Sequence, residues 1–266
     1  PFSDTDRRAI GVVTCDIDQD GYEEIYFLNT DSFSGNKLYS DRLLDLENNK
    51  LKDLFLLDKN IKDLNYTAGR SVACVDRNGD GKYGIYVSNY GGPARFYELE
   101  NDILVDQAPS LNLDRITGGR AVVVGNIISG KSDIFAANER GANFLYTNKN
   151  GSFNEVAKQF GIADELQNGR GTTLSDIFYD GELDIINGNW RGYHRAYVKN
   201  NDTEMYAKKI NFDYDTSIIE LIDDVIIIRN EEKITGDYGT LDTRNNSYKI
   251  KSNNQNKVKV IIQNNE

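Results

Sequence analysis

Nine residues near the amino terminus have the spacing of a calcium-binding loop. Within Asp16–Glu24, carboxylates stand at positions one, three, five and nine, and Gly21 at position six permits a sharp turn. A hard cation takes about six to eight oxygen ligands, and alternate residues of a tight loop direct their oxygens to one point. The pattern predicts a Ca²⁺ site whose ligands are Asp16, Asp18, Asp20, Glu24 and, through its backbone carbonyl, Tyr22.

An EF-hand shares the first half of this loop, so the two motifs have to be separated. The bidentate glutamate at position twelve of an EF-hand falls on Phe27, and the flanking residues favour strands rather than helices. The loop is therefore expected to join two β-strands, with calcium relieving the repulsion among its converging carboxylates.

Two later segments repeat parts of this loop. Asp176–Asp184 keeps positions one, five and nine but has Phe178 at position three, where a water molecule would supply the oxygen. Asp76–Gly84 keeps positions one, three and five but has lost the ninth ligand at Gly84. We expect calcium affinity to fall in that order below the first loop. The expected ligands are Asp176, Asp180, Glu182 and Asp184 in one segment, and Asp76, Asn78, Asp80 and Lys82 in the other. Glu182 and Lys82 stand at position seven and would bind through their backbone carbonyls, as is expected of Tyr22 in the first loop.

A third segment, Asn126–Asp133, lacks the aspartate series and is one residue short. It is expected to be a bare hairpin without a cation, so replacing Asp133 should change little. By the same logic, Gly84→Glu should supply the missing ninth ligand and tighten the site at Asp76.

The loops belong to a repeated order of short strands. Each repeat has an apolar strand, the loop, a second strand ending in asparagine, and a third strand after a glycine turn, placed at Asn36–Tyr39 in the first repeat. The second strands end at Asn29, Asn89, Asn138 and Asn189, which lie 60, 49 and 51 residues apart. The repeats are assigned to residues 7–66, 67–116, 117–166 and 167–205.

This periodicity predicts an all-β fold, a partial β-propeller with about four clear blades. A β-sandwich is the alternative, but sandwiches do not repeat their loop chemistry. Residues 206–266 are expected to hold a degenerate repeat, with strands at 218–229 and 257–263 and an Asn-rich stretch of turns at 245–256. A ring usually takes about six or seven blades, with seven expected for the parent, so we expect exposed sheet edges and self-association.

The charge and hydropathy of the chain argue against nucleic-acid binding and against membrane insertion. With 42 acidic against 31 basic residues the net charge is -11, which repels nucleic acids and anionic membranes and attracts cations. No apolar run approaches the roughly eighteen residues of a membrane span, so no membrane insertion is expected. The chain begins at Pro1 without a signal segment, and we interpret it as a fragment or a processed chain.

The chain has two cysteines, Cys15 and Cys74, each just before an acidic loop. Cys15 precedes Asp16 by one residue and Cys74 precedes Asp76 by two, so their side chains should point to opposite faces of their strands. We therefore expect free buried thiols rather than a disulfide.

Catalytic chemistry is sparse in the sequence. His194, the only histidine, stands at a repeated strand position, and Trp190 is expected to be a packed residue of a turn rather than a ligand anchor. We expect a non-enzymatic protein. Sequons at Asn65, Asn150, Asn201 and Asn245 agree with glycosylation and secretion.

The acidic loop within a repeat of about fifty residues resembles the FG-GAP or VCBS propellers, which include the heads of integrin α-subunits. Residues 9–30, 69–90, 132–146 and 184–197 are more specifically similar to the cartilage acidic protein family. That resemblance covers residues 7 to 200 and implies a secreted or extracellular-matrix protein with a larger propeller. The chain differs from the family in lacking the earlier blades and a Cys-rich module, and its tail does not match.

Three functions remain open at this stage. The leading one is a calcium-stiffened interaction module that binds an extracellular receptor or matrix component. The alternatives are a glycan-binding module and a calcium-dependent polysaccharide-acting enzyme, which would need a base and a charge-neutralising cluster in a cleft.

Overall fold

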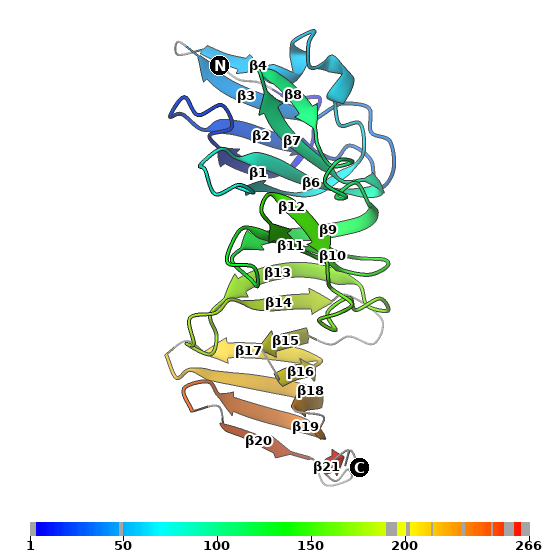
Figure 1. The fold of residues 1–266 in the computed structure, drawn as a ribbon. Coiled ribbons are helices and arrows are strands. Elements are labelled where there is room, and N and C mark those ends of the chain that lie inside the picture. The colour runs from blue at the N-terminus through cyan, green and yellow to red at the C-terminus, as the bar shows by residue number, and fades with distance from the viewer. Residues whose placement is uncertain are drawn as a thin grey trace. The chain divides into compact units, whose positions relative to one another are not determined.

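The computed structural model is built from antiparallel β-strands (Figure 1). It describes residues 4–47, 50–189, 196–200, 203–213, 215–229, 232–245, 247–252 and 258–261. The helical residues described are two single 3-10 turns, η1 at Leu54–Leu56 and η2 at Ile61–Asp63. No helix in the described ranges is long and apolar enough to cross a membrane. The prediction of an all-β chain is confirmed.

The chain divides into two compact units, Pro1–Leu166 and Gln167–Glu266. The first unit holds a meander of four strands for each of the first three predicted repeats, one strand more than the three predicted in each. The end of β6 also pairs with the start of β9, so the second and third meanders form one eight-stranded sheet. The first is β1 Ala9–Cys15, β2 Glu24–Asn29, β3 Arg42–Glu47 and β4 Lys50–Asp53. The second is β5 Gly69–Val75, β6 Gly84–Pro93, β7 Arg95–Glu100 and β8 Ile103–Asp106. The third is β9 Ile116–Gly125, β10 Asp133–Asn138, β11 Phe144–Lys149 and β12 Ser152–Glu155.

The second meander lies between the first and the third, as the side chains of β6 show. Ile85 and Val87 belong to one buried cluster with Leu28 of β2, whereas Tyr86 between them belongs to another with Tyr146 of β11. Alternate residues of a strand point to opposite faces, so the two faces of this sheet are both covered. Burying each large apolar side chain stabilises the unit by about 1.5 to 3 kcal/mol.

Successive repeats approach closely where their first strands begin. A Cβ atom at Gly69 would lie 2.2 Å from Cδ1 of Leu28, and one at Gly119 would lie 1.9 Å from Oγ of Ser88. Leu28 and Ser88 stand in equivalent positions of β2 and β6, so the same contact is made twice. The Gly-Arg pairs at the start of the second and third repeats, Gly69-Arg70 and Gly119-Arg120, therefore mark sheet stacking.

The prediction of free thiols is wrong, because Cys15 and Cys74 form a disulfide with their Cα atoms 6.2 Å apart. Their side chains do point to opposite faces of their own sheets, as the sequence suggested. When two similar sheets stack, however, one contributes its front face to the interface and the other its back face. Because Cys15 and Cys74 point to opposite faces of their own sheets, both lie in that interface. The opposite orientation of the two side chains therefore brings the sulfurs of β1 and β5 together.

The third strand of the first repeat is β3, at Arg42–Glu47, and the predicted strand at Asn36–Tyr39 is wrong. Within that segment, Asn36 makes only an isolated bridge with Thr67. Asp41 follows it and accepts a hydrogen bond from the backbone N–H of Asn29 at 2.7 Å. Asn143 does the same for Asn138 in the third repeat, so the first repeat carries an insertion before this shared residue.

The second unit begins with the fourth repeat, whose strands are β13 Gly169–Ser175, β14 Asp184–Asn189, β15 Ala196–Asn200 and β16 Thr203–Ala207. Its sheet continues through a long hairpin of β18 Ile218–Arg229 and β19 Glu232–Asp242. β17 Lys209–Asp213 pairs with β18, and β20 Ser247–Lys251 and β21 Lys259–Ile261 pair with β19.

The predicted strand at 218–229 is confirmed, and β21 lies inside the strand predicted at 257–263. The Asn-rich stretch is not all turns, because β20 lies within it. Three residues singled out from the sequence, Trp190, His194 and Asn201, lie outside the described residues.

Candidate metal centre

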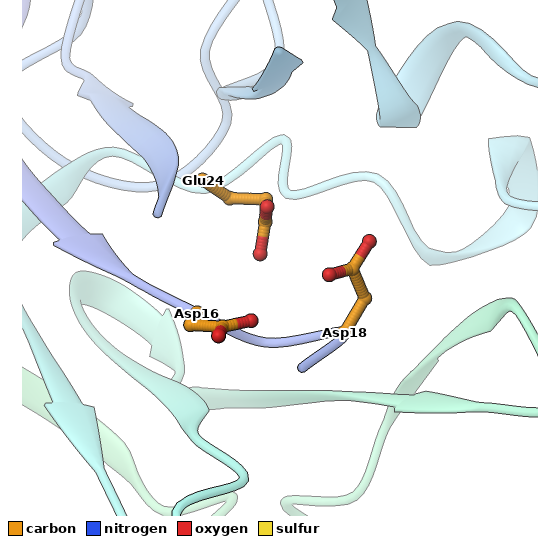
Figure 2. A group of neighbouring side chains, drawn as sticks. All are labelled: Asp16, Asp18 and Glu24. Atoms are coloured by element: carbon orange, nitrogen blue, oxygen red, sulfur yellow. The ribbon is translucent and has the colours of Figure 1, made fainter. Parts of the chain in front are cut away.

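The first acidic loop is the connection of the β1–β2 hairpin. Cys15 pairs with Glu24 at the base of the hairpin, which places Asp16 and Glu24 at the two ends of the loop and close in space. The backbone N–H of Ile17 donates a hydrogen bond to Oε2 of Glu24 at 2.7 Å. This bond holds the glutamate side chain over the start of the loop (Figure 2).

Hydrogen bonds within the loop turn its carboxylates inward. The N–H of Gly21 donates to Asp16 at 3.1 Å, that of Asp20 to Asp18 at 3.0 Å, and that of Tyr22 to Asp20 at 2.8 Å. Gly21 has a φ of +90°, a conformation that suits glycine, and the equivalent Gly81 and Gly181 have φ values of +81° and +85°. The glycine at position six is thus required by the turn in all three loops.

Three carboxylates converge at this hairpin. One oxygen from each of Asp16, Asp18 and Glu24 lies within 4.8 Å of the others, and Figure 2 shows the three side chains directed toward a common space. Ca²⁺ binds oxygens at about 2.3 to 2.6 Å, so ligands on opposite sides of one ion are separated by about this distance. The spacing fits a single calcium ion.

Two oxygens in this group are buried without a hydrogen-bond partner: Oδ1 of Asp16 and Oε1 of Glu24. Glu24 is 1% exposed. Leaving a buried polar atom unsatisfied costs about 1 to 3 kcal/mol, and more when it carries charge. A bound cation would remove this cost, so the donor set fits a hard metal ion.

Burial and mutual repulsion disturb the ionisation of the site. Burial, followed by the charges of Asp18, Asp45 and Asp16, raises the pKa of Glu24 to about 7. Burial and the neighbouring carboxylates also raise the pKa of Asp18. The structure therefore disfavours negative charge in this loop unless a positive charge accompanies it.

Among the described residues, the other loops do not bring three carboxylates so close together. In the fourth loop, Asp176 accepts hydrogen bonds from the N–H groups of Asp180 and Gly181, and Asp184 accepts one from Ile177 at 2.9 Å. Burial, and then the charges of Asp180 and Asp176, raises the pKa of Asp184 to about 7. The hairpin base is therefore organised like that of the first loop.

The second loop differs because it contains its own positive charge. Asp76 accepts hydrogen bonds from three backbone N–H groups of its loop, and Lys82 donates from its Nζ to the carbonyl of Leu99 at 2.6 Å. Arg77 at position two binds both carboxylate oxygens of Glu98 on β7, at 2.5 and 2.9 Å. The structure places no carboxylate at the ninth position, where Gly84 stands.

The expectation that Gly84→Glu would tighten this site is not supported by the packing. A Cβ atom at Gly84 would lie 2.6 Å from Cζ of Phe96, which is buried in the core between the second and third sheets. A glutamate could enter only by moving that ring. Gly84 is thus a packing requirement rather than a missing ligand.

The third loop joins β9 and β10 as a hairpin, and hydrogen bonds to Asp133 hold its base. Asp133 is fully buried, and its carboxylate accepts hydrogen bonds from the N–H groups of Ile128, Ser129 and Asn148 and from the hydroxyl of Ser129, at 2.5 to 2.8 Å. It occupies the place of Glu24 and Asp184 at the hairpin base. Protein donors here do what a cation would do in the first loop, so replacing Asp133 is expected to lower the stability of the fold while changing its calcium response little.

One carboxylate beside the first loop, that of Asp45, was not predicted from the sequence. Asp45 lies on β3, outside the loop, yet its oxygen is within 4.8 Å of oxygens of Asp18 and Asp20. No loop motif includes this position, and only the pairing of β3 with β2 reveals it.

The raised pKa values predict how stability depends on pH. The pKa of Glu24 in the folded protein lies above its ordinary value of 4.5, so folding favours the protonated form. Stabilisation from this group is present below pH of about 4.5 and is lost as the pH rises through about 7. Melting in the presence of a chelator should show a falling melting temperature over this interval. The slope should be shallower in Glu24→Gln, and equal slopes would contradict the electrostatic interpretation.

This chain is similar to curated proteins that share the name cartilage acidic protein 1. No family model matches it. It is 44% identical over 216 residues to cartilage acidic protein 1 of Xenopus tropicalis, an alignment that covers 74% of this chain and 33% of that protein. The proteins of the same name from Mus musculus and Homo sapiens are also 44% identical, over 214 residues each. The chain spans about a third of the length of these curated relatives.

Proposed function

We propose that this chain is a calcium-binding, non-catalytic part of an extracellular β-propeller that presents a rigid surface to a protein partner. The observation that carries the calcium assignment is the convergence of Asp16, Asp18 and Glu24 with two buried oxygens that have no partner. The ligands are all oxygens, the kind of ligand that Ca²⁺ binds. Calcium held there would fix the β1–β2 hairpin in one conformation.

Stacked meanders support the propeller architecture. Each repeat of the first unit is an antiparallel meander of four strands, and β6 buries opposite faces against the meanders before and after it, although its end also pairs with β9. A propeller is built from sheets that cover one another in this way around an axis. The outer face of β1, with Ile10 and Val12 about half exposed, is the surface on which a preceding blade would lie.

The disulfide supports an extracellular location. Bonds such as Cys15–Cys74 form and persist in oxidising compartments and are rare in the cytosol. The relatives from Xenopus tropicalis, Mus musculus and Homo sapiens are called cartilage acidic protein 1, which agrees with a matrix environment. At the roughly millimolar calcium found outside cells, sites of this kind are occupied.

The calcium assignment is tested by thermal melting of the full chain in millimolar calcium and in chelator. With dissociation constants of about 0.1 to 1 mM, each occupied site should add about 0.4 to 1.4 kcal/mol of stability. The melting temperature should therefore rise by a few degrees with calcium. Glu24→Gln should abolish most of this rise.

Glu23→Gln is the matched control, because Glu23 is the neighbouring carboxylate but is exposed and bonded to the hydroxyl of Thr14. It should respond to calcium like the unmodified protein. Identical melting curves with calcium and with chelator, in the unmodified chain, would contradict the proposal.

A further inference from the structure

A second group of carboxylates lies beside the first and shares one residue with it. One oxygen from each of Asp18, Asp20 and Asp45 lies within 4.8 Å of the others. Ile25 of β2 pairs with Leu44 of β3, so Glu24 and Asp45 are cross-strand neighbours on the same face of the sheet. Two like charges in such positions destabilise a sheet unless something neutralises them.

The position of Asp45, largely buried and close to other carboxylates, needs a physical explanation. It is 8% exposed, and in the part of the chain that the structure describes its carboxylate has no hydrogen bond and no ion pair. Lys52 of β4 is the cross-strand partner of Asp45, but its Nζ forms its ion pair with Glu47, at 3.2 Å. A largely buried residue whose carboxylate lies within 4.8 Å of two others, with no ion pair of its own, is a costly arrangement.

The second repeat shows what the fold places at the same position. Ile85 pairs with Tyr97 as Ile25 pairs with Leu44, which makes Glu98 the equivalent of Asp45. The guanidinium of Arg77 lies against Glu98 and donates to both of its oxygens. Arg77 stands at position two of its loop, where the first loop has Ile17, so the carboxylate of the first repeat has no arginine bonded to it.

Charge counting favours more than one ion in the first repeat. Lys52 and Lys59 line the hollow beside these groups, but Glu47 and Asp102 line it as well and offset their charge. The two overlapping groups contain five carboxylates, so a single divalent cation would leave three negative charges among them and two cations would leave one. The five are Asp16, Asp18, Asp20, Glu24 and Asp45. An open hollow of about 350 Å³, lined in part by Asp18, Asp20 and Asp45, gives an ion access from solvent.

We infer that a second divalent cation, of the calcium type, binds between Asp18, Asp20 and Asp45, with Asp18 bridging it to the ion held by Asp16 and Glu24. This inference rests on the proposed calcium function of the loop. In the second repeat the arginine–glutamate pair of Arg77 and Glu98 takes the place of this second ion. The first hairpin is therefore anchored by cations to β3 as well as within its own loop.

Calorimetric titration of the full chain with calcium tests the inference through its stoichiometry. Asp45→Asn should lose one bound ion per chain relative to the unmodified protein, while the binding that depends on Glu24 persists. Glu47→Gln is the matched control, since Glu47 lines the same hollow but is paired with Lys52, and it should keep the full stoichiometry. Asp45→Ala, which removes both oxygens, should lose the same single ion.

The outcomes separate this inference from the function on which it rests. Unchanged stoichiometry in both Asp45 variants, together with loss of binding in Glu24→Gln, would overturn the second ion and leave the first. Loss of all calcium binding in a folded Asp45→Asn protein would show one shared ion and also overturn the inference. No calcium binding by the unmodified chain would overturn both.

Discussion

Breaking the Cys15–Cys74 disulfide is expected to lower the free energy of unfolding by about 4 kcal/mol, because the bond closes a loop of roughly sixty residues in the unfolded chain. It also joins β1 to β5, so it connects the first two stacked sheets at the residue before Asp16. Denaturant unfolding with and without reductant should show a large drop in the transition midpoint.

A double variant, Cys15→Ser with Cys74→Ser, should unfold at the reduced midpoint and be indifferent to reductant. This control separates loss of the bond from other effects of the reductant. Equal midpoints for oxidised and reduced protein would show that the bond is absent in solution.

The second large effect is expected at Asp133. Replacing it by alanine leaves the buried N–H group of Asn148 and the partly buried N–H groups of the loop residues Ile128 and Ser129 without their acceptor, and removes bonds that are strong because the acceptor is charged. We expect a loss of about 3 kcal/mol or more in the free energy of unfolding. The exposed Glu165→Gln is the control and should change stability little.

The response of this variant to calcium distinguishes the third loop from the first. Asp133→Ala should keep the full rise of melting temperature with calcium, because its carboxylate is already satisfied by protein donors. If Asp133→Ala is as stable as the unmodified protein, the hydrogen-bond network around Asp133 is contradicted. If it loses the calcium response, calcium binds at the third loop, and the assignment to the first loop is wrong.

Local chemistry made the strands and the first loop predictable. Short runs of Val, Ile, Tyr and Phe identify strands without knowledge of their neighbours, and the spacing of Asp16, Asp18 and Glu24 is set by one tight turn. The strand at 218–229 was found for the same reason. These signals lie within a few residues of one another along the chain.

What the sequence did not reveal depends on contacts between distant segments. Pairing of Cys15 with Cys74 requires two sheets to stack, and the place of Asp45 requires the register of β3 against β2. The role of Gly84 requires Phe96 to lie beneath it, and that of Asp133 requires Asn148 from the following strand. No spacing within one segment encodes such contacts.

The central claim is that the first hairpin holds calcium, and locating the ion tests it most directly. An anomalous difference map from crystals grown with calcium should show a peak within coordination distance of Asp16, Asp18 and Glu24, with Oε1 of Glu24 among the ligands. The absence of a peak there, with that oxygen bonded to a protein donor or to water while calcium is present in millimolar amounts, would contradict the claim.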